Sequence, residues 1–560
     1  MKTVKLVIAQ LNFIVGNIEA NRDIIIDACQ QAFDQQARVI VFPELALTGY
    51  PPEDLLLRPE LYSRCNDALE KICGQLKQFE KPFAVVLGYP KHGQSQAQIL
   101  NIAGVIQDGV ITDEYAKQTL PNYKVFDEMR YFTAGEEACV VTIDEIPFGL
   151  SLCEDIWVDS PIEKSIAAGA KCIINLNASP FHIGKPAQRE SVLKAYARRH
   201  QLPIIYANLI GGQDELVFDG HSFTVNEKGD VAQRAPEFEP GLFSVQVDWD
   251  GENAKVTSQS CTALLDELSS IYQALVMGVR DYVHKNGFRG AVIGLSGGID
   301  SALTLAIAVD ALGAEHVEAV SMPSRYTAGM SVDDAKEECD LLGVNFELIS
   351  IEKTFDAFLA LLKPVFGALP VDTTEENIQA RCRGILLMAI SNKKRKIVLT
   401  TGNKSEMAVG YATLYGDMAG GFDVLKDVSK TRVFALSKWR NQQSRVIPQR
   451  VIDRPPSAEL APDQKDSDSL PDYEILDPIL AQYIEQDRSA EDMVAEGYAA
   501  QDVSRVMQLV DTTEYKRRQA PPGVRITERA FGRDRRYPVT SGFHHGRGER
   551  NKANSQGEKG

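Results

Sequence analysis

A glycine-rich loop, GLSGGIDS at residues 294–301, constrains the fold of this chain more than any other segment. It follows the strand-like run AVI and precedes a long apolar helical run, ALTLAIAVDAL. Two adjacent glycines let the backbone approach an anion with its N–H groups turned inward, and the N-terminus of the helix adds a positive dipole. The segment therefore predicts a phosphate-binding loop in a domain of alternating strands and helices.

The side chains of this loop indicate the kind of phosphate chemistry. Ser296 and Ser301 can donate their hydroxyls to phosphate oxygens. Asp300 would repel phosphate unless a cation lies between them, so the loop implies bound Mg²⁺. It is not a Walker A loop, because no Lys-Ser/Thr pair follows the glycines at the required offset.

At 560 residues the chain is too long for one hydrophobic core, and about two to four domains are expected. Residues 1–250 alternate short β-branched runs with helical patterns, which is typical of an α/β domain with mostly buried strands. A helix is predicted from Ala263 to about Lys285, and a second α/β run follows it. The predicted strands are Val39–Phe42, Phe83–Gly88, Phe148–Leu152, Cys172–Leu176, Pro203–Ala207, Ala291–Gly294, Val317–Ser321 and Ile397–Thr400.

Two segments lack such patterns. Residues 446–475 contain five prolines with acidic residues between them, and we expect a mobile loop rather than a packed element. The polar, Gly-rich residues 541–560 are expected to be disordered. The chain is therefore divided into two α/β domains, 1–250 and 263–540, followed by a tail.

The charge balance and the cysteine content exclude several classes of protein. Lys and Arg number 60 against 77 Asp and Glu, a net charge of −17, so a basic face for nucleic acid or an anionic membrane is not expected. Nine cysteines without a Cys-x-x-Cys pair do not indicate a disulfide framework or a zinc site. No apolar run reaches about 18 residues, and the N-terminus is not typical of a signal peptide. We therefore expect a soluble, cytoplasmic protein.

Three reactive side chains follow strand-like runs in the first half: Glu44 in VFPELALTGY, Lys117 in EYAKQTLPNY and Cys153 in GLSLCEDIW. A thiol that attacks a carboxamide needs a base for its proton, a positive group for the oxyanion and an acid for the leaving amine. Glu44 can act as base and then as acid. Lys117 can stabilise the oxyanion, and its charge would also favour the thiolate of Cys153. The trio predicts an amidase.

A second polar cluster follows the predicted strand at residues 397–400. Within it, Glu406 could share a magnesium ion with Asp300, because two carboxylates can neutralise an ion bound to pyrophosphate. Further cations are expected from Lys404, Lys426 and Lys430.

The loop GLSGGIDS resembles the SGGxDS pyrophosphate loop of the ATP-pyrophosphatase superfamily. Together with LTTGNKSE (399–406) and YGDMAGGFD (415–423), it makes the second half similar to the NAD synthetase family. The resemblance implies a Rossmann-like (adenine nucleotide α-hydrolase) doubly wound parallel sheet. It also implies that ATP adenylates the carboxylate of nicotinic acid adenine dinucleotide and that ammonia then displaces AMP. It assigns the dinucleotide to Asn377, Glu406 and Lys516, and Mg²⁺ to Asp300 and Glu406. The residues that it assigns to ATP are Gly294, Leu295, Ser296, Gly297, Gly298, Ile299, Asp300, Ser301 and Thr401.

The trio of the first half, with its segment Cys153-Glu154-Asp155, resembles the nitrilase (carbon–nitrogen hydrolase) superfamily. This resemblance implies an α-β-β-α sandwich and a glutaminase. It assigns glutamine binding to Tyr123, Ser179 and Lys185, with Glu128 as a second carboxylate near the trio. Papain-like chemistry is disfavoured, because the segments around the histidines do not resemble that family.

As a whole the chain resembles the glutamine-dependent NAD synthetase family, in which the first domain makes ammonia and the second consumes it. A water-poor tunnel between the two sites is expected, since free ammonia at neutral pH is mostly ammonium. The resemblance also implies a homo-oligomer. Two alternatives stay open: another adenylating amidotransferase, of the asparagine or GMP synthetase type, and a nitrilase fold kept as an assembly platform beside a nucleotide-binding half. The segment TGNKSE disfavours the first alternative, and the intact trio disfavours the second.

Overall fold

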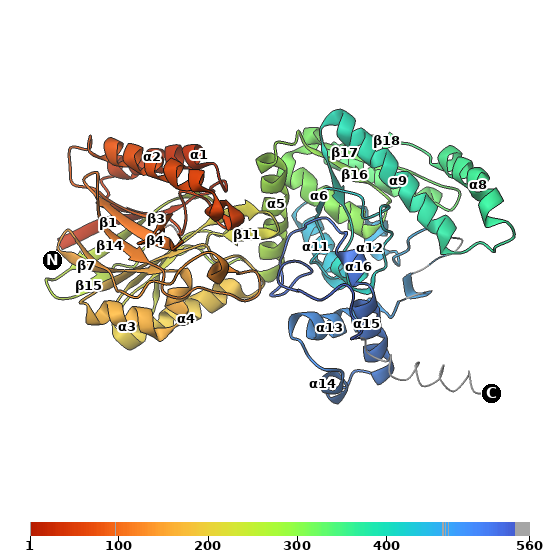
Figure 1. The fold of residues 1–560 in the computed structure, drawn as a ribbon. Coiled ribbons are helices and arrows are strands. Elements are labelled where there is room, and N and C mark those ends of the chain that lie inside the picture. Colours follow the sequence, from red (N-terminus) through yellow and green to blue (C-terminus); the bar gives the residue numbers. More distant parts are fainter. Residues whose placement is uncertain (1, 96, 462–463, 465, 469, 544–560) are drawn as a thin grey trace. The chain divides into compact units, whose positions relative to one another are not determined.

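The computed structural model describes residues 2–95, 97–461, 464, 466–468 and 470–543. It divides into two compact units, Met1–Ser270 and Ile271–Gly560 (Figure 1). The predicted tail lies mostly outside the described residues, since 544–560 are not among them.

The first unit contains two sheets. One has the strand order β15-β14-β1-β2-β3-β4-β5, the other β13-β12-β9-β8-β7-β6, and β10 pairs with β11 as a separate hairpin. The bounds are β1 Lys2–Gln10, β2 Val39–Val41, β3 Ala84–His92, β4 Ile99–Gln107, β5 Val110–Ala116, β6 Val140–Ile143, β7 Ile146–Leu152, β8 Cys172–Asn177, β9 Ile204–Asn208, β10 Ile210–Gln213, β11 Leu216–Asp219, β12 Phe223–Val225, β13 Val231–Arg234, β14 Gly241–Trp249 and β15 Ala254–Val256.

The alternation of side chains along β1 shows how the layers form. Leu6 and Ile8 pack in a core that also contains Leu150 of the second sheet, so this core lies between the two sheets. Val7 points the other way, into the core under α1 (Ile18–Asp34) and α2 (Pro59–Leu76). A third core joins the second sheet to α3 (Asp159–Ala167) and α4 (Lys185–His200). The predicted α-β-β-α sandwich is confirmed (Figure 1).

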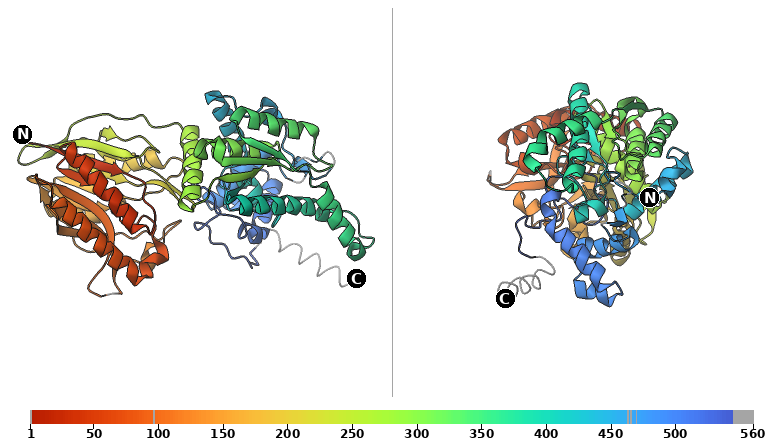
Figure 2. Two further views of the ribbon diagram at one scale, coloured as in Figure 1. Left: turned by 90° about the horizontal axis from the view of Figure 1, so that it is seen from above. Right: turned by 90° about the vertical axis from the view of Figure 1, so that its right-hand side faces the viewer.

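The second unit is built on one parallel sheet with the order β18-β17-β16-β19-β20. Its strands are β16 Ala291–Gly294, β17 Val317–Ser321, β18 Asn345–Leu348, β19 Ile397–Thr400 and β20 Phe422–Asp423. The chain runs outward from β16 to β18 and then returns to the other side of β16, so the strand order reverses there. With right-handed connections this reversal places helices on both faces, which confirms the doubly wound fold (Figures 1 and 2).

Four helices connect the strands from β16 to β19: α6 Ile299–Leu312, α7 Gly329–Leu342, α8 Glu352–Phe366 and α9 Thr373–Lys394. The remaining helices of eight or more residues are α5 Glu267–Lys285, α11 Lys430–Gln443, α13 Tyr473–Leu480 and α15 Ala500–Thr512, and the shorter ones are α10 Lys404–Val409, α12 Gln449–Asp453, α14 Ala490–Ala495 and α16 Glu514–Arg517. A core of its own joins α10, α13 and α15.

All eight predicted strands are present, and β3 extends beyond its predicted end to His92. The expectation of a mobile loop at 446–475 was wrong for its first part. Ile447 and Val451 are buried, and α12 forms there. No helix in the described ranges is long and apolar enough to cross a membrane. All nine cysteines lie within those ranges, and each is a free thiol.

Glu338 of α7 carries a buried carboxyl group whose oxygens accept no hydrogen bond within the described chain. The residue is 1 % exposed. Burial raises the pKa of Glu338 well above its ordinary value. The folded protein therefore keeps this proton at pH values where the unfolded chain, with a pKa of about 4.3, releases it, so stability falls as pH rises above that value.

We expect the variant Glu338→Gln to gain stability over the parent as pH rises. The difference in the free energy of unfolding should grow by about 1.4 kcal/mol per pH unit between about pH 4.3 and the folded pKa. Denaturant unfolding between pH 5 and pH 8 measures it. Glu337→Gln is the matched control, because the neighbouring Glu337 is about half exposed and pairs with Arg445. A difference that does not change with pH would contradict the prediction.

Candidate active sites

The centre of the first candidate site is a buried ion pair between Glu44 and Lys117. Glu44 follows β2 and Lys117 directly follows β5. Lys117 Nζ lies 2.8 Å from Glu44 Oε1, and both side chains are fully buried. Asn101 Nδ2 donates to the same oxygen at 2.8 Å, whereas the backbone N–H of Ala178 donates to Oε2 at 3.1 Å. The carboxylate is therefore held from three separate strands, β4, β5 and β8.

Glu128 is a second carboxylate on the same ammonium group. Lys117 Nζ lies 2.8 Å from Glu128 Oε2, and the hydroxyl of Tyr50 donates to Glu128 Oε1 at 2.9 Å. Burial raises the pKa of Glu128 to about 7, against the opposing charge of Lys117. Burial lowers the pKa of Lys117, but Glu128 and Glu44 outweigh it and hold that pKa well above its ordinary value. The ammonium group is thus a permanent positive charge.

Cys153 lies where β7 turns into a short 3₁₀ helix, Cys153–Trp157. Its φ of 40° is in the left-handed region, a strained conformation that clusters at active sites when the residue is not glycine. Asp155 fixes this turn, because its carboxylate accepts from the backbone N–H groups of Leu152 and Thr119 and from the hydroxyl of Tyr115. Through Thr119 it ties the cysteine turn to the segment that carries Lys117.

The thiol of Cys153 is 4 % exposed. Burial, and next the negative charge of Glu44, raise its pKa well above the ordinary value, and Lys117 opposes this only in part. Lys117 favours the thiolate as expected, but burial and Glu44 outweigh it, so the pKa of the thiol stays raised and the resting thiol keeps its proton. Attack requires Glu44 to remove that proton in the same step.

Two of the three residues assigned to glutamine lie against the Cys153 turn. The hydroxyl of Tyr123 donates to Glu154 Oε1 at 2.8 Å, and Lys185 Nζ lies 4.0 Å from the ring centre of Trp157. Burial, and next the charge of Arg189, lower the pKa of Lys185 to about 8. Ser179 is in the loop after β8, next to Ala178, whose backbone N–H binds Glu44.

The second candidate site is a cavity of about 280 Å³ at the carboxyl ends of β16, β17 and β19. This is the point where the strand order reverses, the position at which open α/β sheets bind ligands. The walls contain all residues of 294–301 except Gly297, together with Thr401 and Glu406. Gly297 has φ 79°, and a Cβ there would lie 2.2 Å from the carbonyl oxygen of Ser331, so only glycine fits.

Asp300 and Glu406 meet at the ammonium group of Lys430. Lys430 Nζ lies 2.6 Å from Asp300 Oδ2 and 3.1 Å from Glu406 Oε1, and Asn403 Nδ2 donates to Asp300 Oδ1 at 2.8 Å. Burial raises the pKa of Glu406 to about 8, with Lys430 opposing it. Burial lowers the pKa of Lys430, but Asp300 and Glu406 reverse that effect and leave it raised. The two predicted magnesium ligands thus share one cation.

No group of three or more His, Cys, Asp or Glu side chains with the arrangement of a metal site occurs in the described part of the chain. Two carboxylates nevertheless fit Mg²⁺, which is usually held by one or two carboxylates together with water and substrate phosphates. The oxygen donors of Asp300 and Glu406 have this character.

The other residues assigned to the dinucleotide do not line the described cavity. Asn377 accepts from the hydroxyl of Thr413, and Lys516 Nζ donates to the carbonyl oxygens of Gly410 and Ala412 at 2.8 Å. Both therefore contact the segment that follows α10.

Of the three lysines expected to supply cations, only Lys430 belongs to the described wall of the cavity. Lys404 is buried in ion pairs with Asp427 and Glu485 and is not among the described residues of the cavity wall.

Residues 454–460, in the proline-rich segment expected to be a mobile loop, also line the cavity, and sequence reasoning assigned no individual site residue there. Arg454 reaches this loop through Ser331: its Nη1 donates to the Ser331 hydroxyl at 2.8 Å, and Nη2 lies 3.5 Å from the carbonyl oxygen of Gly297. Arg383 of α9 also lines the cavity. The only signal for these residues was a basic residue beside two prolines, and such a pattern is too common to identify a site.

Comparison with known proteins gives a consistent result. Residues 5–254 match the carbon-nitrogen hydrolase family and residues 271–520 match the NAD synthase family. The chain is 48 % identical over 545 residues to the glutamine-dependent NAD(+) synthetase of Acinetobacter baylyi, covering 97 % of this chain and 99 % of that relative. The corresponding enzyme of Aquifex aeolicus is 42 % identical over 568 residues, with 96 % and 99 % covered.

Two solved structures of glutamine-dependent NAD+ synthetases also match. The ADP complex of the Acinetobacter baumannii enzyme is 45 % identical with a TM-score of 0.78, covering 97 % of this chain and all of that one. The Cytophaga hutchinsonii structure is 22 % identical with a TM-score of 0.81, covering 99 % of this chain and 100 % of that one. At this identity the match supports the fold and nothing further.

Fold and sites define a two-part class of protein, a carbon–nitrogen hydrolase unit followed by an NAD synthase unit. The 48 % identity to the Acinetobacter baylyi enzyme over nearly the full length of both chains makes the family assignment more specific. The chain belongs to the glutamine-dependent NAD(+) synthetase family.

Proposed function

We propose that this chain makes NAD from glutamine, ATP and nicotinic acid adenine dinucleotide. Glutamine hydrolysis at Cys153 supplies ammonia, which amidates the adenylated carboxylate of the dinucleotide to give NAD, AMP and pyrophosphate. The observation that carries this proposal is the presence of two sites in one chain: a thiol with a buried Glu44–Lys117 pair, and a glycine loop at the reversal point of a parallel sheet. We assign the first activity to residues 1–250 and the second to residues 263–540.

In the glutaminase, Glu44 takes the proton of Cys153 as sulfur attacks the carboxamide carbon of glutamine. Lys117 stabilises the oxyanion of the tetrahedral intermediate. Glu44 then returns the proton to the leaving nitrogen, so ammonia departs and a thioester remains. Water, deprotonated by the same carboxylate, cleaves the thioester to glutamate and restores the thiol. Tyr123, Ser179 and Lys185 hold the glutamine.

In the synthetase, the backbone N–H groups of the glycine loop and the hydroxyls of Ser296 and Ser301 bind the phosphates of ATP. Mg²⁺, where bound, is held by Asp300 and Glu406 and neutralises phosphate charge. Thr401 lies at the cavity wall and contacts the nucleotide. Lys430 already holds both carboxylates and balances their charge. Asn377, Glu406 and Lys516 bind the dinucleotide, whose carboxylate attacks the α-phosphate of ATP and releases pyrophosphate.

Location and assembly also belong to this proposal. Free thiols at all nine cysteines support a reducing compartment, and we assign the protein to the cytoplasm. Four large apolar residues on or just after α8 are more than 70 % exposed, namely Leu361, Val365, Leu369 and Val371. Such a patch supports a homo-oligomer.

The deciding experiment is product analysis. Glutamine, ATP, Mg²⁺ and nicotinic acid adenine dinucleotide are incubated with the protein, and NAD, AMP, pyrophosphate and glutamate are quantified. We expect NAD, AMP and pyrophosphate in equal amounts. AMP formed with aspartate or a purine nucleotide as acceptor, but not with the dinucleotide, would overturn the proposal. Sedimentation of the same preparation gives the oligomeric state.

A further inference from the structure

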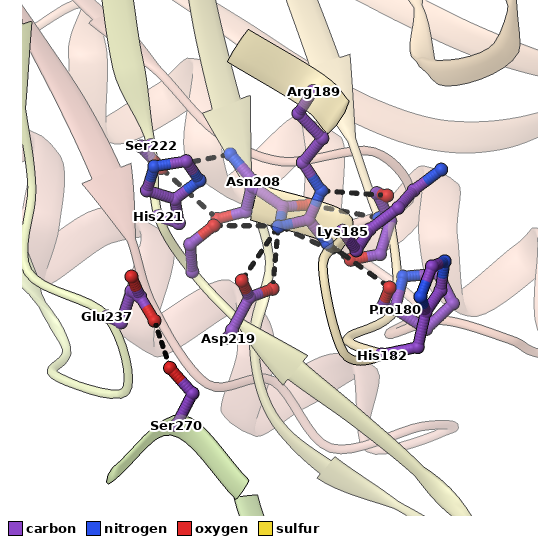
Figure 3. A network of polar contacts seen from close by, with 12 residues as sticks. Pro180, His182, Lys185, Arg189, Asn208, Asp219, His221, Ser222, Glu237 and Ser270 are labelled. Atoms are coloured by element: carbon purple, nitrogen blue, oxygen red, sulfur yellow. Dashed lines mark hydrogen bonds and ion pairs between the residues drawn. The ribbon is translucent and has the colours of Figure 1, made fainter. Parts of the chain in front are cut away.

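Arg189 of α4 is among the largest fully buried side chains of the described residues. Its guanidinium Nη1 donates to both oxygens of Asp219, at 2.8 and 2.7 Å. Nη2 donates to the carbonyl oxygens of Ser179 and Pro180, at 2.7 and 3.2 Å, and Nε donates to the Ser179 hydroxyl at 3.2 Å (Figure 3). All three nitrogens are engaged within the protein, so Arg189 cannot itself bind substrate.

These contacts converge on one short loop. Asn208 completes the arrangement: its Oδ1 accepts from the backbone N–H of Ser179 at 2.9 Å, and its Nδ2 donates to the carbonyl oxygen of the same residue at 3.3 Å. The backbone N–H, the backbone carbonyl and the hydroxyl of Ser179 are thus each bound by a buried side chain. Such a loop keeps one conformation without ligand.

We infer that Arg189, held by Asp219, is a positioning residue of the glutaminase that directs the Ser179 hydroxyl toward glutamine. The inference rests on the proposed glutaminase function of the first unit. A guanidinium group has donors and no acceptor, so the Ser179 oxygen must be the acceptor in their hydrogen bond. The hydroxyl proton is therefore available to another oxygen, and in the complex this is an oxygen of the bound glutamine. Arg189 occupies one of the two lone pairs of this oxygen, and the O–H remains as a donor for the substrate.

The position of Arg189 on α4 strengthens the inference. Lys185 lies one turn earlier on the same helix, at its first residue, and reaches the Cys153 turn through Trp157. One helix therefore supplies a cation toward the thiol and anchors the loop beside it. The adjacent ion pair of Arg234 with Glu190, at 2.7 Å, involves the same helix, but neither residue has a contact with Ser179 among the described hydrogen bonds. It serves as a matched control.

The test compares three variants of the full-length protein. Arg189→Lys keeps the charge but not the forked geometry. The double variant R189M/D219L removes both charges of the ion pair. Both are removed because loss of one partner would leave the other as an unpaired buried ion, whereas apolar replacement of both partners is often tolerated. Arg234→Met is the control, and in this variant Glu190 keeps its ion pair with Lys194 at 2.8 Å. For each we measure kcat and KM for glutamine, ammonium-driven NAD synthesis, and alkylation of Cys153 by iodoacetamide, which lacks the α-amino and carboxyl groups of glutamine.

We expect KM for glutamine to rise about tenfold in R189K and about a hundredfold in the double variant, the size of effect that a misplacement near 1 Å produces. Ammonium-driven synthesis and the alkylation rate should stay within about twofold of the parent, as should every parameter of Arg234→Met. A KM within about twofold of the parent in both Arg189 variants overturns the inference, and so does an equal loss of alkylation and glutamine turnover. If the double variant does not fold, R189K decides. A parent protein that does not hydrolyse glutamine would refute the proposed function itself.

Discussion

The variant Cys153→Ala is expected to lose glutamine-driven NAD synthesis by roughly 10⁴-fold or more, because removing a covalent nucleophile eliminates the step that all later steps depend on. Synthesis from added ammonium salt should remain within about twofold, since every described residue of the cavity wall belongs to the second unit. Initial rates of NAD formation, with glutamine and with ammonium chloride as alternative nitrogen donors, measure how far each of the two activities is lost.

Cys139→Ala is a suitable control for this variant. Cys139 is a free, half-buried thiol of the same unit that packs against the core between the sheets, so its loss tests the general effect of removing a thiol. Both activities of this control should stay near the parent level. Equal loss of glutamine-driven and ammonium-driven synthesis in Cys153→Ala would sink the assignment.

The second large effect is expected from Asp300→Asn. The substitution keeps the size of the side chain and an oxygen that can accept from Asn403. It removes the charge that faces Lys430 and that, in the proposed mechanism, holds Mg²⁺ together with Glu406. We expect NAD synthesis to fall by about 10²- to 10³-fold with either nitrogen donor. Losses of rate of this size are usual when one group that stabilises the charge of the transition state is removed. Glutamate formation by the first unit should persist.

Asp310→Asn separates this effect from a structural one. Asp310 lies on the same helix, α6, and accepts from Arg440 at 2.7 Å, away from the cavity wall. Its variant should retain at least about half of the parent rate. Pyrophosphate release shows which step fails: unchanged release by Asp300→Asn in the presence of the dinucleotide would exclude the proposed role.

The fold was predictable from the sequence where the pattern is local. Parallel strands buried on both faces appear as continuous apolar runs, and all eight such runs are strands. The strands β4 and β14 were not among the predicted ones, although β4 contains the apolar run Ile102–Ile106 and β14 alternates between apolar and polar residues from Val245 to Trp249. The glycine loop was predictable in detail, because its backbone requirement lies within eight consecutive residues.

The contacts of the sites were less predictable, since they join residues far apart in the chain. Asn101 and Ala178 bind Glu44 across 57 and 134 positions, and no local signal reports either contact. The protonation state of Cys153 could not be inferred, because burial decides it and the sequence shows only the charges. Arg189 gave no signal either, since an arginine on a polar helix is usually exposed.

The two oxygens of Glu44 accept different numbers of hydrogen bonds, and this difference has a stereochemical consequence. A carboxylate oxygen has two lone pairs, and those of Oε1 are taken by Lys117 and Asn101. Oε2 receives one backbone N–H, from Ala178, and keeps the other lone pair. In the proposed glutaminase mechanism a single atom therefore shuttles the proton between sulfur, nitrogen and water, and the carboxylate need not rotate during the catalytic cycle.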